Sequence, residues 1–283
     1  MVPESKITPK ISIIIACYND IDVVVAVKSA YHQTYPNKEI IVVDDGSNQQ
    51  TQTAIQSVRE FIDVVITQNN QGQSIARNNG IKKATGKYIL NLDSDDYFEP
   101  EFCDKAVKKF QQHSDTKIVT CYARRFSKSG EIDIFSPLGG YLQNFLFSNS
   151  ALGSSMFKKA DWETCGGYEE NLPILGFEDW EFYLNVLKTG GVAHVLPEVL
   201  FNYQVRENST SAKIKYFKQD KFKHIILKHS ELYKENFEGM VTNLFDRVKT
   251  EEIEKNRNEK SIDFRLGSAI LRPFRFIKSL RLK

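Results

Sequence analysis

The feature that most restricts the fold of this chain is a regular alternation of short β-branched runs and helical segments over residues 11 to 112. The apolar runs are ISIIIA (11–16), IIVVDD (40–45), VVIT (64–67) and YILNLD (88–93). Helices are predicted at about 22–33, 50–60, 73–84 and 100–112, the last opened by Pro100. This alternation is typical of βαβ units. It predicts an α/β fold with a doubly wound, mostly parallel, Rossmann-like sheet and helices on both faces.

The second part of the chain follows a different pattern. Segments 117–126 and 131–135 predict a hairpin, 152–157 another strand, 178–188 a helix, and 192–206 an extended segment. Polar helices are expected over 213–256. We therefore divide the chain into a domain of residues 1–210, with halves 9–112 and 113–210, and a helical C-terminal extension over 211–283.

Composition excludes several classes of protein. The 283 residues carry a net charge of +2, so we expect no nucleic-acid partner. No stretch has eighteen consecutive apolar residues, and the N-terminus lacks the apolar core of a signal peptide. The four cysteines show no CxxC spacing, so we expect them to be reduced and the protein to be cytoplasmic.

Acidic side chains follow two of the predicted strands. Asp45 ends the second apolar run, and Asp93, Asp95 and Asp96 end the fourth. In doubly wound sheets, ligands bind at the carboxyl ends of the strands. A solvated turn with helix caps is the ordinary alternative, but like charges this close raise one another's pKa unless a cation compensates. Mg²⁺ typically takes one or two carboxylates together with substrate phosphates.

Other phosphate and metal sites do not fit. An EF-hand loop fails because Tyr97 stands at its fifth position and Phe98 where the turn glycine belongs. The chain has neither GxxxxGK[ST] nor a GxGxxG after the first strand, which argues against a P-loop NTPase and a dinucleotide dehydrogenase. A metal bridging a nucleotide diphosphate fits the acidic strand end best.

Four stretches of the sequence carry a resemblance to a known family. They are ISIIIACYND, IIVVDDGS, NNQGQSIARNNGIKKATGKYILNLDSDD and GGYEENLPILGFEDWEFYLNVLKTG. In order and spacing they resemble the family-2 inverting glycosyltransferases with the GT-A fold, including those of bacterial cell-surface polysaccharide synthesis. The resemblance covers about residues 9 to 210. A lone DxD would be a weak signal, whereas four motifs in register are specific.

The resemblance implies roles for particular residues. Asp93 and Asp95 match the DxD pair, with Asp95 on Mn²⁺ or Mg²⁺ and Asp93 as a second ligand near the ribose. Asp179 matches the catalytic base. The positions implied to bind the nucleotide-sugar are Ala16, Tyr18, Asn19, Asp45, Asp93 and Arg77. Those implied to border the acceptor are Gly153 and Glu178.

The chemistry of sugar transfer needs these residue types. A metal stabilises the leaving nucleoside diphosphate, and a carboxylate removes the proton of the attacking hydroxyl. In-line attack inverts the anomeric centre. If Asp179 lies in the first turn of its helix, the helix dipole lowers its pKa, and burial opposes that effect. "EDWE" is also compatible with acids that merely begin a helix.

One position departs from the family. Many relatives carry a histidine in a motif like YRxHxxS, and here "YQVRENS" has Arg206 in its place. An arginine cannot ligate a metal but can pair with diphosphate oxygens, and we expect that role unless Arg206 is a surface residue. His194 is expected to be packed. Trp162, Trp180 and Tyr168 are either an acceptor wall or core.

These residues predict a metal-dependent hexosyl- or N-acetylhexosaminyl-transferase. The donor is expected to be a UDP-sugar and the acceptor a hydroxyl of a glycan or lipid-linked glycan. A sugar-nucleotide pyrophosphorylase would show a Gly- and Arg-rich loop after the first strand, and ACYND has neither residue. A catalytically inactive scaffold would be expected to lose the DxD or ED carboxylates, and both are present.

The C-terminal tail predicts contact with a membrane surface. Residues 264–283 hold six basic and no acidic side chains interleaved with Leu, Ile and Phe, although Pro273 would kink or split a helix. A basic tail without such a function is the alternative. We expect peripheral association with the inner face of the cell membrane. Deleting 264–283 should abolish sedimentation with anionic liposomes, and unchanged sedimentation would refute the expectation.

Overall fold

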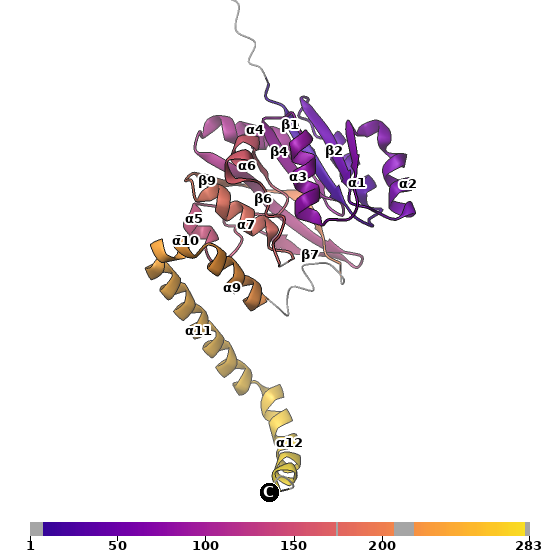
Figure 1. The fold of residues 1–283 in the computed structure, drawn as a ribbon. Coiled ribbons are helices and arrows are strands. Elements are labelled where there is room, and N and C mark those ends of the chain that lie inside the picture. Colours follow the sequence, from indigo (N-terminus) through magenta and orange to yellow (C-terminus); the bar gives the residue numbers. More distant parts are fainter. Residues whose placement is uncertain (1–7, 174, 207–217, 281–283) are drawn as a thin grey trace, which may run out of the picture. The chain divides into compact units, whose positions relative to one another are not determined.

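The computed structural model describes residues 8–173, 175–206 and 218–280, with the backbone alone for 218–219 and 272–280. The chain divides into two compact units, residues 1–229 and 230–283, which are described separately. Figure 1 shows the first unit as a sheet covered by helices and the second as helices only.

The first four long strands form the parallel part of the sheet. β1 (Ile11–Cys17) lies between β2 (Lys38–Asp44) and β4 (Tyr88–Asp93), and β3 (Val64–Thr67) pairs with β2. All of these pairings are parallel, as the βαβ pattern predicts. The register places Ala16 opposite Asp93 and Cys17 opposite Asp44. The carboxyl ends of these strands therefore meet at one edge.

The sheet continues beyond β4 with strands from the second part of the chain. Over the described residues, its order is β3-β2-β1-β4-β8-β6-β9-β5, and β7 pairs with β6. These strands are β5 (Tyr97–Phe98), β6 (Thr116–Ser127), β7 (Gly130–Phe135), β8 (Met156–Lys158) and β9 (Val192–Gln204). β6 and β7 form the predicted hairpin, and β9 runs parallel to β6. The predicted α/β fold class is confirmed.

Two predicted boundaries are wrong. The strand expected over 152–157 begins only at Met156, because residues 152–155 form a turn in which the Ser155 hydroxyl donates to the Leu152 carbonyl at 2.7 Å. The helix expected to open at Pro100 is α4 (Phe102–Gln112), whose N-cap is Glu101. The short strand β5 was not predicted.

Helices cover both faces of the sheet. Among the described residues up to 206, the α-helices are α1 (Val23–Tyr31), α2 (Gln49–Ser57), α3 (Gln73–Lys83), α4, α5 (Leu142–Phe145), α6 (Lys159–Cys165) and α7 (Glu178–Leu187). α1 packs on the face that carries Ile13 and Ile15. α3 packs on the opposite face, where a Cβ at Gly80 would meet Ile14 at 2.6 Å. This close approach brings α3 down onto β1.

After β9 the described chain is helical. α9 (Lys218–Lys228) belongs to the first unit, and the second contains α10 (Ser230–Glu235), α11 (Phe237–Lys260) and α12 (Ile262–Leu280). α12 runs through Pro273 as one helix, so the helix is not split there, and a kink at Pro273 stays a prediction. None of the described helices is long and apolar enough to cross a membrane. Most basic side chains of the tail lie outside the described residues, and membrane contact stays a prediction.

Candidate active site

The strand register gathers the predicted donor-site residues at one edge of the sheet. Ala16 is the penultimate residue of β1, opposite Asp93 at the end of β4, and Asp45 follows β2. Tyr18 and Asn19 continue directly from β1. Asn19 has a left-handed backbone, with a φ of 52°. Its side chain accepts a hydrogen bond from the Asn48 amide at 2.7 Å, which ties the turn after β1 to the turn after β2.

Asp45 is buried and already engaged. Its carboxylate accepts hydrogen bonds from the Gln68 side chain at 2.7 Å and from the Gln71 and Gly72 amides at 2.9 Å each. Asp45 therefore fixes the loop between β3 and α3. Tyr18 is 53% exposed at the same edge, so its ring is accessible to a planar ligand. Contact of both residues with a nucleotide base stays a prediction.

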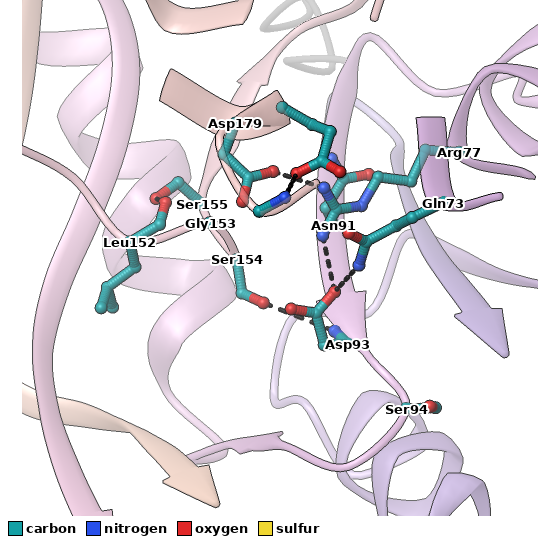
Figure 2. A network of polar contacts seen from close by, with 12 residues as sticks. Gln73, Arg77, Asn91, Asp93, Ser94, Leu152, Gly153, Ser154, Ser155 and Asp179 are labelled. Atoms are coloured by element: carbon teal, nitrogen blue, oxygen red, sulfur yellow. Dashed lines mark hydrogen bonds and ion pairs between the residues drawn. The ribbon is translucent and has the colours of Figure 1, made fainter. Parts of the chain in front are cut away.

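The centre of the site is a buried guanidinium between two carboxylates (Figure 2). Arg77 of α3 is 1% exposed. Its Nη2 lies 2.6 Å from Asp93 Oδ1, and its Nη1 pairs with Asp179 Oδ1. The guanidinium also lies over the ring of Tyr168, 5.4 Å from its centroid. Arg77 thus connects the end of β4 with the beginning of α7, and its contact with Asp179 joins residues 102 apart in sequence.

Asp179 is held against the backbone of the segment before β8. It is the second residue of α7, as predicted. A Cβ at Gly153 would lie 2.4 Å from Asp179 Oδ2, so only glycine leaves room for this carboxylate. The Tyr183 hydroxyl, one turn further along α7, donates to the Leu152 carbonyl at 2.7 Å and fixes that segment. The predicted acceptor-side residue Gly153 is therefore in direct contact with Asp179.

The pKa of Asp179 is raised to about 6. Burial is the main cause, Arg77 opposes it, and the charges of Asp93 and Glu178 add to it. The dipole of α7 therefore does not dominate. A carboxylate with this pKa is ionised at neutral pH and is a better proton acceptor than an ordinary aspartate.

The acidic turn after β4 is also electrostatically unusual. The pKa of Asp95 is raised to about 6 by burial and by the charge of Asp93, while Arg206 lowers it. Burial raises the pKa of Asp96 further, and although its Oδ1 accepts from the Gln204 amide at 2.8 Å, its Oδ2 is buried without a partner. Arg206 therefore compensates the charges of Asp95 and Asp96 only in part.

This turn fits a divalent cation that is bound together with a ligand. The described residues hold no ready-made group of three or more acidic, histidine or cysteine ligands. Asp93 and Asp95 remain partly exposed, each with a side chain 27% accessible. Two accessible carboxylates and an unpartnered oxygen behind them suit a hard cation that completes its coordination with phosphate oxygens and water.

Arg206 reaches this turn, as its position in the sequence predicted, but it contacts carboxylates. It lies 3.3 Å from Asp95 Oδ2, 3.1 Å from Asp20 Oδ1 and 2.8 Å from Asp22 Oδ2. The Ser94 hydroxyl also donates to Asp20, at 2.8 Å. Arg206 thus adds a positive charge at the turn, beside the pairing of Asp93 with Arg77, and its pairing with diphosphate oxygens stays a prediction.

Sequence reasoning missed several supporting residues. Gln73 donates to Asp93 Oδ1 at 3.1 Å, and the Ser154 hydroxyl accepts from the Asp93 amide at 3.4 Å. Glu178 was predicted at the acceptor side, but it is buried and accepts from the Gly176 amide at 2.6 Å. Gln73 begins the helix that carries Arg77, and Ser154 follows Gly153. Their closeness in sequence to predicted site residues was the signal that could have indicated them.

The aromatic residues considered as an acceptor wall are packed in the protein. Tyr168, Trp180 and Trp162 are 1%, 4% and 9% exposed. The Tyr168 ring stacks on Phe182 at 4.3 Å, and its hydroxyl accepts from the Asn91 side chain. The core alternative therefore holds for these three side chains. Of the three, Tyr168 lies under the guanidinium of Arg77 and supports the site from below.

Comparison with known proteins identifies the family. Residues 12–157 match the family described as Glycosyl transferase family 2. A glucosyltransferase of Escherichia coli, UDP-Glc:alpha-D-GlcNAc-diphosphoundecaprenol beta-1,3-glucosyltransferase WfaP, is 31% identical over 222 residues, which are 76% of this chain and 82% of WfaP. The chain belongs to glycosyl transferase family 2, and it is a glycosyltransferase.

Other relatives are longer than the matched region. The putative glycosyltransferase EpsH of Bacillus subtilis is 34% identical over 44% of this chain, and the match spans 37% of EpsH. S. aureus TarS 1-349 in complex with UDP-GlcNAc superposes with a TM-score of 0.60 at 22% identity, covering 72% of this chain and 61% of that one. The mannosyltransferase PcManGT from Pyrobaculum calidifontis, in complex with GDP-Man and Mn²⁺, gives a TM-score of 0.58 at 16% identity, with 93% and 84% coverage. These structures confirm the GT-A fold.

The first prediction concerns the central ion pairs. Arg77→Met is expected to lower the free energy of unfolding by about 3 kcal/mol, because Asp93 and Asp179 lose their shared cation. The deficit should be largest above pH 6, where Asp179 is ionised, and should shrink as the pH falls. Urea unfolding at several pH values measures it.

The matched control is Arg125→Met, which removes an exposed arginine paired with Asp133. This variant should lose less than about 1 kcal/mol. Equal losses in the two variants would contradict a central role for Arg77.

Proposed function

We propose that this protein is an inverting glycosyltransferase that moves a sugar from a UDP-sugar to a hydroxyl of a glycan or lipid-linked acceptor in surface polysaccharide synthesis. The observation that carries the proposal is the pairing of Arg77 with both Asp93 and Asp179. Asp93, which we assign to the donor site, and Asp179, which we assign as the base, bind the two ends of one guanidinium, and this supports the proposal. Sugar transfer needs the group that binds the donor and the group that activates the acceptor to lie this close, because the sugar reacts between them.

The choice of a UDP-sugar rests on relatives. WfaP is named for a UDP-Glc donor, and TarS was solved with UDP-GlcNAc. PcManGT was solved with GDP-Man, so the fold accommodates another nucleotide. In this chain, Tyr18 and Asp45 would flank the base, with Ala16 and Asn19 beside it. The accessible ring of Tyr18 and the fixed position of Asp45 support that assignment.

Asp95 and Asp93 would hold Mn²⁺ or Mg²⁺ with the donor diphosphate. When bound, the metal would stabilise the charge that develops on the leaving diphosphate. The raised pKa of Asp95 and the unpartnered oxygen of Asp96 support a cation at this turn. Arg206 would add positive charge on the same side of the site. It would separate from the carboxylates that it now contacts, and those carboxylates would then face the metal.

Asp179 would accept the proton of the acceptor hydroxyl. Arg77 occupies its Oδ1, and Gly153 closes one side of its Oδ2, so the carboxylate has a defined orientation. A general base needs both this geometry and a pKa near the working pH. Attack opposite the leaving diphosphate inverts the anomeric centre in a single displacement. The alternative, an inactive scaffold, is disfavoured because all the carboxylates of this arrangement are present.

Replacing the base tests the mechanism. Asp179→Asn is expected to keep UDP binding within about 3-fold and to lower kcat by about 10³-fold, because it removes the proton acceptor. In the wild type at saturating Mn²⁺, kcat/KM should fall about tenfold per pH unit below about pH 6, as Asp179 is protonated. Radiolabelled sugar transfer at a series of pH values measures both.

Saturating metal matters in that experiment because protonation of Asp95 would otherwise weaken metal binding in the same pH range. Asp133→Asn, at an exposed carboxylate of β7, is the control and should transfer normally. Wild-type turnover in Asp179→Asn would remove this residue from the mechanism.

Donor and metal binding can be tested without an acceptor. UDP with Mn²⁺ is expected to raise the melting temperature of the wild type more than UDP alone, because a ligand that binds only the folded state stabilises it. In Asp95→Ala the metal-dependent part of the shift should vanish. Differential scanning fluorimetry with UDP, GDP and dTDP measures these shifts.

A metal-dependent shift with GDP instead of UDP would keep the enzyme class and change the donor. The absence of any shift with all three nucleotides would contradict the donor site itself.

A further inference from the structure

α7 has a second polar face besides the one that carries Asp179, and α9 covers it. The Trp180 indole stacks on Phe222 of α9, with ring centroids 5.6 Å apart and planes 10° apart. Lys221 of α9 donates to the Leu175 carbonyl at 2.5 Å, in the loop that leads into α7. Figure 1 shows α9 directly beside α7. α9, the first helix after β9 among the described residues, is therefore attached to the helix of the candidate base.

The strongest contact between the two helices is electrostatic. Glu181, two residues after Asp179, is 0% exposed. Its Oε1 lies 2.7 Å from Lys228 Nζ and 3.0 Å from His229 Nε2. Asn185 of α7 also donates to Oε1, at 2.7 Å, and Oε2 has no partner. We call Glu181, Lys228 and His229 the α7–α9 clamp.

The clamp stabilises a buried negative charge. A buried carboxylate is costly unless a cation and hydrogen bonds compensate it. Burial would raise the pKa of Glu181, yet His229 and Lys228 lower it below its ordinary value. Lys228 is the last residue of α9, and His229 follows it directly. The ionised state of Glu181, and with it the first turn of α7, depends on that end staying in place.

A cavity of about 270 Å³ beside the clamp does not change this interpretation. It is lined by Glu169, Glu170, Glu181 and Lys228 together with the loop 165–168 and α7. A cationic ligand there would compete with Lys228, which already bridges Glu169 at 2.8 Å and Glu181. The cluster carries its own cation, so it is better explained as a connection between elements than as a ligand site.

We propose that Lys228 and His229 are positioning residues for sugar transfer, which hold α7 through Glu181 so that Asp179 keeps its place between Arg77 and Gly153. This inference rests on the proposed role of Asp179 as the base. Asp179 has little freedom, because Gly153 leaves no room for a Cβ and Arg77 fixes one of its oxygens. A small displacement of α7 would misplace the base without disturbing Asp45 or Tyr18.

The test separates positioning from folding. Lys228→Met is expected to lower kcat about 10- to 100-fold, since misplacement of a catalytic group by about 1 Å costs up to that amount. The KM for the UDP-sugar should change less than about 3-fold. Lys228→Arg, which keeps the charge, should recover at least half of kcat. All variants are assayed as the full chain, well below their melting temperatures.

The double variant Glu181→Gln/Lys228→Met removes the buried charge along with its partner. Its stability should return toward that of the wild type, because no unpaired charge remains, while kcat stays low. Recovery of kcat in the double variant would overturn the proposal, since the single variant would then have failed only through an isolated buried charge. Lys234→Met, at an exposed pair with Glu231, is the matched control and should keep full kcat.

Failure of this inference is distinguishable from failure of the proposed function. If the wild type transfers sugar and Lys228→Met transfers it equally well, the clamp has no positioning role and the function stands. If Asp179→Asn transfers sugar at the wild-type rate, the proposed base fails and the clamp inference fails with it.

Discussion

Two carboxylates from distant parts of the chain face each other across the guanidinium of Arg77, and the rest of the site is arranged around that contact. Asp93 ends β4, in the parallel half of the sheet. Asp179 lies in the first turn of α7, a helix that follows the antiparallel strands of the same sheet. Without a cation between them, these like charges would repel at low solvent access. Arg77 is itself buried, so its positive charge needs the two carboxylates as partners as much as the carboxylates need Arg77.

The sheet sets the distances between the site residues, and the turns that follow its strands set the orientation of their side chains. The register of β1 with β2 and β4 aligns Ala16, Asp44 and Asp93 at one edge. Polar turn residues then fix the loops above the edge: Asn19 and Asp45 accept hydrogen bonds from neighbouring backbone amides. These hydrogen bonds tie the loops at this edge to one another.

The sequence allowed the parallel part of the sheet, the segments that form its four strands and the positions of the acidic residues to be predicted, because local patterns determine them. Alternating apolar runs mark strands, and clustered acids at their ends mark the edge where ligands bind. The contact of Arg77 with Asp179 could not be predicted in this way, since it joins residues 102 apart through the packing of α3 and α7. The same holds for Glu181, which looked like one more acid at a helix start until the structure placed Lys228 beside it.

Gly153 has a consequence for the direction from which a substrate approaches. One oxygen of Asp179 is occupied by Arg77, and the other lies so close to Gly153 that no Cβ fits between them. Under the proposed mechanism, the incoming hydroxyl can meet only the remaining open side of Oδ2. The backbone of Gly153 then restricts the side from which the acceptor attacks, and with it the stereochemistry of the linkage. Variation of side chains around the acceptor would change which sugar is accepted, but not the side from which that sugar attacks.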